Sequence, residues 1–268
     1  MNQDFCKPEE NLYLVATAHT DPDGMDRLTT FLNRVNPKRI LIEISKDRAE
    51  RILQHSIDDK MREHEKEMDR WAKQGFNLSA DQRDQILELA RFKNENYGFE
   101  IRAALVYQQE MPSCEIDYID VCVPRQKRRF VAGLREMVGI HQELTPQMRR
   151  SIEEGLSYPV NIHKQHYRAD IEIEYRRAYQ MAHYYDQVAR NPQLFEIETR
   201  GLSLQAKEAF KYVIDPERNV KMAKTIRKKH EEGGGTVATI GATHAYLIRP
   251  LLEEAKIIPL NMVDAMRE

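Results

Sequence analysis

Five short runs of apolar residues, separated by much longer charged stretches, constrain the fold of this chain more than any other feature. They lie at residues 12–18, 39–44, 115–121, 236–242 and 256–262. The first, second and fourth are nearly continuous aliphatic or β-branched runs, typical of parallel strands covered on both faces. The third alternates between polar and apolar residues, so we place it nearer an edge of the sheet. Residues 24–35 have the length of a helical crossover, which predicts a β-α-β unit.

The stretches at residues 46–112 and 125–232 have helical patterns almost throughout. One seam of tyrosines and small residues recurs every three or four positions, at Tyr167, Ile171, Tyr175, Ala178, Ala182, Tyr185 and Ala189. It predicts one continuous helix packed against another, and we interpret the tyrosines as packing residues. The sequence therefore predicts an α/β fold with a mostly parallel central sheet, helices on both faces and a large helical insertion. We treat residues 1–268 as a single domain with helical insertions at about 46–112 and 125–232.

Charge and composition exclude several classes of protein. The chain has 41 Lys and Arg against 43 Asp and Glu, a net charge of −2, which argues against a nucleic-acid partner. Its apolar runs are well short of the roughly 18 residues that a membrane span needs. The first ten residues, MNQDFCKPEE, lack the features of a signal peptide. Three cysteines without paired spacing favour a reducing compartment, so we expect a cytoplasmic protein.

Chemically capable side chains stand where the predicted strands end. His19, Glu43, Asp120 and His244 each follow or close one of the first four runs. Ligands of open parallel sheets bind at the carboxyl ends of the strands, so these side chains are expected to meet at one edge. Glu43 is the most informative of them, because a carboxylate at the end of an apolar strand needs a partner to offset its desolvation. The set suits a metal site or an acid–base site; the alternative for each residue is that it caps a nearby helix, which is a stronger alternative for Asp120 than for His19, Glu43 and His244.

Four motifs in this order resemble the TraB/PrgY/TIKI superfamily, which also takes in the GumN, erythromycin-esterase and ChaN-like proteins. That group carries paired G-x-x-H motifs, one near each end of the domain. Here the second motif is Gly241-Ala242-Thr243-His244, and the first is Ala16-Thr17-Ala18-His19, with Ala in place of Gly. Further matches are Glu43 at a strand end, Arg48 downstream of it, and the helix-start set Arg218, Asn219 and Met222. Asp120 matches an aspartate common after the third strand, whereas Val121 replaces the usual neighbouring arginine. The resemblance spans residues 11–262.

The resemblance implies hydrolysis, by one of two mechanisms. The TIKI likeness implies a peptide-bond substrate and a divalent ion, Mn, Co or Zn, held by His19 and His244, with Glu43 as a further ligand or as the base that activates the bound water. The erythromycin-esterase likeness implies a metal-free site in which a His–Glu pair activates water, with a small ester as substrate. Both assign catalytic roles to Glu43, His19, His244 and Arg218, and substrate contacts to Arg218, Asn219 and Asp120.

Arg218 needs an anion in either mechanism. Asp215-Pro216 predicts a helix start, which places Arg218 in the first helical turn. The helix dipole disfavours a cation there unless an anion offsets it. Glu43, Asp120 or a bound substrate could supply that anion.

Other interpretations stay open. A protein of this fold could bind and sequester a peptide without turnover, and the ChaN-like relatives imply haem binding. Residues 19–24 (HTDPDG) also resemble the opening of the DHH phosphoesterases, but no Asp-His-His motif follows, and the string also suits a turn into a helix. The helical arms offer a surface through which a homo-oligomer could form.

Overall fold

The computed structural model describes residues 11–54, 56–120 and 145–266. Its centre is a five-stranded sheet in the order β3-β2-β4-β1-β5, in which every pair of neighbours is parallel. The strands are β1 (Leu12–Thr17), β2 (Arg39–Ile42), β3 (Glu115–Tyr118), β4 (Thr236–Gly241) and β5 (Lys256–Pro259). The predicted α/β fold with a parallel sheet is therefore confirmed. β1, β2 and β4 are buried along their whole length, and β3 lies at an edge and is partly exposed, as its alternation predicted.

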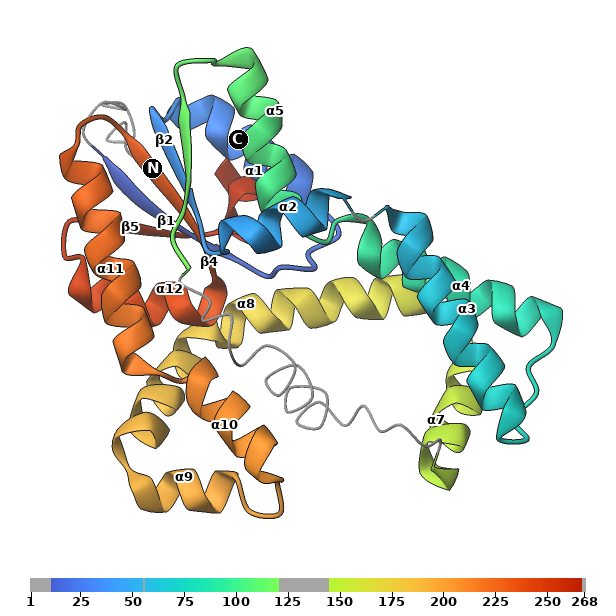
Figure 1. Ribbon diagram of the computed structural model, residues 1–268. Helices are drawn as coiled ribbons and strands as arrows, with labels where there is room; N and C mark the ends of the chain where they lie inside the picture. The colour runs from blue at the N-terminus through green and yellow to red at the C-terminus, as the bar shows by residue number, and fades with distance from the viewer. Residues whose placement is uncertain (1–10, 55, 121–144, 267–268) are drawn as a thin grey trace.

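Helices cover the sheet in two groups (Figure 1). On one side α1 (Gly24–Val35) packs against α5 (Phe99–Glu110) and against the 3-10 helix η3 (Leu260–Met266). On the other side α11 (Pro216–Glu231) packs against α12 (Ala242–Ile248), which also contacts β1. A second 3-10 helix, η2 (Arg249–Leu251), continues α12. One continuous core of apolar side chains fills the space between these helices and the sheet.

The remaining helices lie outside these two groups, and most of them extend away from the sheet (Figure 1). They are α2 (Lys46–Gln54), α3 (Ile57–Lys73), α4 (Ala80–Glu95), α7 (Pro146–Leu156), α8 (Val160–Arg190), α9 (Pro192–Glu198) and α10 (Leu204–Val213). The helical pattern is confirmed for 46–54, 56–112 and 145–232, while residues 55 and 125–144 lie outside the described residues. In both stretches the last helix, α5 or α11, covers the sheet instead of extending from it. Along the described parts of the chain, no helix is both long and apolar enough to cross a membrane.

The helix α8 is the continuous helix that the tyrosine and alanine seam predicted. The residues it buries are Ile171, Tyr175, Ala178, Ala182 and Val188. Its seam packs against α12, so the long helix contacts the layer that carries His244. Its amino-terminal end lies far from the sheet, beside α4 and α7 (Figure 1).

Candidate active site

The four strand-end residues line one pocket at the carboxyl edge of the sheet. His19 follows β1, Glu43 follows β2, Asp120 follows β3, and His244 lies in the first turn of α12 after β4. The pocket has a volume of about 440 Å³, and Arg218 of α11 lines it as well. The parallel sheet therefore brings together side chains that are as far apart as residues 19 and 244 in the sequence.

Gly241, the glycine of the second histidine motif, allows the close approach of the site's side chains. A Cβ atom at this position would lie 3.0 Å from Nε2 of His19 and 3.4 Å from Oε2 of Glu43. Its backbone N–H also donates a hydrogen bond to Oε2 of Glu43 at 2.7 Å. The motif needs glycine here because a side chain would occupy the space that the imidazole and the carboxylate now share.

Arg218 is held between two buried carboxylates. Its Nη2 donates to Oε1 of Glu43 at 2.7 Å and to Oδ2 of Asp120 at 3.1 Å, and its Nε donates to Oδ1 of Asp120 at 3.1 Å. The side chains of Arg218, Glu43 and Asp120 are 14%, 4% and 7% exposed. Burial lowers the pKa of Arg218, but Glu43 and Asp120 raise it by more, so the guanidinium stays charged. The anions that this cation requires in the first turn of α11 are thus supplied by the protein.

His244 is neutral and held in one tautomer by its partners. Its Nδ1–H donates to Oδ1 of Asn219 at 2.9 Å, and its Nε2 accepts from Nη1 of Arg218 at 2.9 Å. Burial is the main cause that lowers the pKa of His244; Arg218 and His19 lower it further, against the opposing effect of Glu43 and Asp120. The Nε2 atom also lies 4.0 Å from Oε1 of Glu43. Asn219, predicted to contact substrate, therefore lies behind His244 and orients it.

His19 pairs with a residue that the sequence analysis missed. Its Nδ1 donates to Oε1 of Glu100 at 2.7 Å, and Oγ1 of Thr17 donates to the same oxygen at 3.1 Å. The His19 side chain is 53% exposed, whereas that of Glu100 is 6% exposed. The protein groups around the half-exposed ring desolvate it, which lowers the pKa of His19, but the Glu100 carboxylate raises this pKa by more, with a smaller contribution from Glu43, to about 9.

A signal for Glu100 was present in the sequence. It is the one carboxylate within the buried run of α5, between Phe99 and Ile101, and it lies in the first turn of that helix. A carboxylate among fully buried apolar residues requires a cationic or hydrogen-bonding partner, and a helix amino terminus favours negative charge. Nothing local in the sequence names His19 as that partner, because α5 follows β2 and His19 follows β1.

Two other motif residues, Arg48 and Met222, lie apart from this cluster of charged side chains. Arg48 is exposed at the pocket, where its Nη2 donates to the hydroxyl of Tyr97 at 3.2 Å. Met222 is 1% exposed and belongs to the apolar core, where it packs under α11. The helix-start motif therefore contributes one side chain to the pocket, one behind it and one to the core.

The predicted ligands His19, Glu43 and His244 do not fit a divalent cation in this arrangement. The guanidinium of Arg218 lies between Glu43 and His244, and both Oε1 and Nε2, which would face a metal, accept its hydrogen bonds. A cation bound there would also lie next to the positive charge of Arg218. Within residues 11–54, 56–120 and 145–266, no group of three or more His, Cys, Asp or Glu is arranged to hold a metal ion.

Comparison with known proteins places this site in a family. A model of the TraB/PrgY/gumN family matches residues 5–256. The chain belongs to this family. No significant match was found among curated proteins or among solved structures. The TraB/PrgY/gumN match includes the two histidine motifs and the residues that line the pocket described above.

Proposed function

We propose that this TraB/PrgY/gumN protein is a metal-independent hydrolase of small esters or peptide bonds, with His19 as general acid and His244 as general base. One observation carries the proposal: two histidines line the same pocket, and their surroundings move their pKa values in opposite directions. Such opposed shifts are the usual way in which acid and base roles are divided between similar side chains. At neutral pH the imidazole of His19 carries a proton to donate, and His244 has an unprotonated nitrogen.

In this mechanism a water molecule attacks the carbonyl carbon of the substrate while Nε2 of His244 takes its proton. This water replaces Nη1 of Arg218 as the hydrogen-bond donor to Nε2 of His244, while Arg218 keeps its bonds to Glu43 and Asp120. The released N–H of Arg218 then donates to the oxyanion that forms. The bond to the leaving group breaks as His19 donates its Nε2 proton to that group. Proton transfer from His244 back to His19 through solvent restores the starting state.

The charge pattern supports a route without metal. Glu43 and Asp120 share the guanidinium of Arg218, and Glu100 pairs with His19, so each of these buried carboxylates has a cationic partner of the protein itself. A divalent ion would have to displace Arg218 from Glu43 and from His244, which leaves the guanidinium without two of its acceptors.

The test uses the purified full chain, stripped with EDTA, on a panel of p-nitrophenyl esters and short peptides. We expect turnover to survive chelation. A plot of kcat/KM against pH should be flat at neutral pH, fall on the acid side below pH 6.5 as His244 becomes protonated, and fall on the alkaline side near pH 9 as His19 loses its proton. His19→Gln and His244→Gln should each lower kcat by about 10²–10⁴-fold. His166→Gln, at an exposed position of α8, is the matched control and should leave kcat unchanged.

Two outcomes contradict the proposal. Loss of activity on chelation, restored by Mn²⁺, Co²⁺ or Zn²⁺, favours the metal-dependent mechanism instead. Absence of turnover across the panel, together with saturable peptide binding or a Soret band on haem addition, favours a binding protein of the same fold.

A further inference from the structure

The turn that carries His19 lies just beyond the hydrogen-bonded part of the sheet. The ladder between β1 and β4 ends at Thr17, paired with Gly241, and residues 18–20 continue without a strand partner. The turn is closed by one backbone bond, from the N–H of Asp21 to the carbonyl of Ala18 at 2.8 Å. Since the His19 side chain is half exposed, its direction depends on how the backbone of this turn is held.

Two tyrosines of the long helix α8 bond the turn on either side of His19. The hydroxyl of Tyr175 accepts from the buried N–H of Ala18 at 3.1 Å, and the hydroxyl of Tyr167 donates to the carbonyl of Thr20 at 3.1 Å. The two tyrosines are eight residues apart, roughly two turns of helix. We propose that Tyr175 and Tyr167 are positioning residues, which hold the His19 turn in the orientation that brings the imidazole to Glu100.

Burying the hydroxyl of Tyr175 costs free energy that a residue needed only for packing would not require. Tyr175 is 4% exposed, and its hydroxyl also donates to Oδ2 of Asp21 at 2.9 Å, a carboxylate that is itself 0% exposed. A phenylalanine facing an apolar residue would fill the same space without burying a hydroxyl and a charge. The structure instead places a satisfied polar network directly under the residue before His19.

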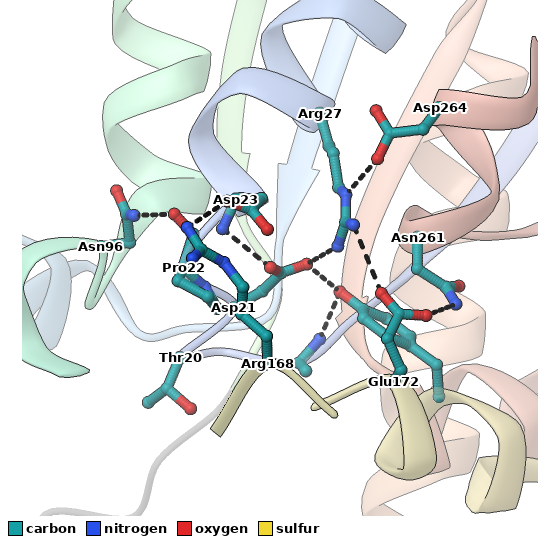
Figure 2. A network of polar contacts seen from close by, with 12 residues as sticks. Thr20, Asp21, Pro22, Asp23, Arg27, Asn96, Arg168, Glu172, Asn261 and Asp264 are labelled. Carbon is teal, nitrogen blue, oxygen red and sulfur yellow. Dashed lines mark hydrogen bonds and ion pairs between the residues drawn. The ribbon is translucent and has the colours of Figure 1, made fainter. Parts of the chain in front are cut away.

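That network is fixed from outside the turn (Figure 2). Nη1 of Arg27 donates to Oδ2 of Asp21 at 2.9 Å, and the N–H of Asp23 donates to Oδ1 of Asp21 at 2.9 Å. Arg27 also contacts Glu172 of α8 at 3.3 Å and Asp264 of η3 at 2.7 Å. Asp21 is therefore bonded both to Arg27 of α1 and to Tyr175 of α8, and the hydroxyl of Tyr175 in turn accepts from the N–H of Ala18.

This inference gives the helical arm a role at the pocket. α8 also contributes Glu174 and Tyr185 to the pocket wall, so one helix both lines the site and bonds the turn that carries the acid. The claim rests on the proposed role of His19 but is tested separately, because the orientation of His19 can be observed without a substrate.

The experiment compares Tyr175→Phe and Tyr167→Phe with wild type in the full chain labelled with ¹⁵N-histidine. Each variant keeps the ring and removes only the hydroxyl. The Nδ1 proton of His19, hydrogen-bonded to Glu100, gives a downfield resonance that is assigned by its loss in His19→Gln. We expect this resonance to shift and broaden in both variants. On the best substrate of the panel, kcat should fall by roughly 10- to 100-fold while KM changes less than about twofold.

Tyr179→Phe is the matched control, on the same helix at a position that is 65% exposed, and its ring contact with Tyr246 is kept by phenylalanine. It should leave both the resonance and kcat unchanged. The inference is overturned if Tyr175→Phe and Tyr167→Phe lower the melting temperature but leave the His19 resonance and kcat as in wild type. Should Tyr175→Phe fail to fold, the partly exposed Tyr167 alone decides the question. An altered resonance in a protein that hydrolyses nothing would uphold the positioning role and refute the proposed function.

Discussion

Replacing Arg218 with alanine tests whether this cation stabilises the folded protein by pairing with the buried carboxylates of the site. The substitution leaves Glu43 and Asp120, 4% and 7% exposed, without the guanidinium that bonds both. Removing one partner of a buried ion pair costs about 3–5 kcal/mol, because the remaining charge stays buried and unpaired. For a chain of this length each kcal/mol lowers the melting temperature by roughly 2–4 °C, so we expect a loss of about 6–20 °C.

The assay is thermal and urea unfolding at pH 7, followed by circular dichroism. Arg62→Ala is the control, since Arg62 is 65% exposed and its ion pair with Asp59 lies within one exposed turn of α3, a contact worth about 0–1 kcal/mol. A loss below about 1 kcal/mol would refute the reasoning.

Three further predictions concern the other half of the site. Gly241→Ala should lower kcat with little change in stability, because the backbone φ of −49° accepts alanine while the new Cβ would lie 3.0 Å from Nε2 of His19; unchanged steady-state kinetics would contradict it. Glu100→Gln should lower the pKa of His19 from about 9, since desolvation then acts against the weaker effect of Glu43 alone; an NMR titration that still gives about 9 would show that Glu100 is not what raises this pKa. The stability that protonated His19 gains from Glu100 is fully present below pH 6.5 and is lost as the pH rises to about 9, because the folded pKa is the higher one. The melting-temperature difference between wild type and His19→Gln should therefore become smaller as the pH rises over this range. A difference that grows with pH would contradict the predicted sign of this pH dependence.

The sequence predicted those residues of the site that lie at the ends of strands. Apolar runs fixed the strands, and parallel pairing then required His19, Glu43, Asp120 and His244 to meet at one edge, as they do. The partners of these residues come from helices whose approach depends on packing across the sheet. Glu100 reaches His19 only because α5 packs beside α1, and no local pattern specifies that neighbour.

Arg218 shows the same limit of sequence-based prediction, because its need for an anion was predicted but the source of that anion was not. The helix-dipole argument required an anion near it, but could not decide between a carboxylate of the protein and a substrate. That choice depends on the distance between α11 and the ends of β2 and β3, which only the three-dimensional structure fixes. The tyrosines of α8 were interpreted as packing residues, and their rings do pack. Their hydroxyls could not be assigned, because the acceptor and donor groups belong to a turn some 150 residues earlier in the sequence.

The two histidines constrain one another electrostatically. The positive charge of His19 is among the causes that lower the pKa of His244, so His244 is neutral in the state in which His19 is an imidazolium. Glu100 supports this division by stabilising the charge on His19, and Arg218 supports it by adding positive charge beside His244. The site therefore favours a single positive charge on the histidine pair across neutral pH. A general acid and a general base that act in one step need this distribution, and here it follows from fixed charges of the fold before any substrate binds.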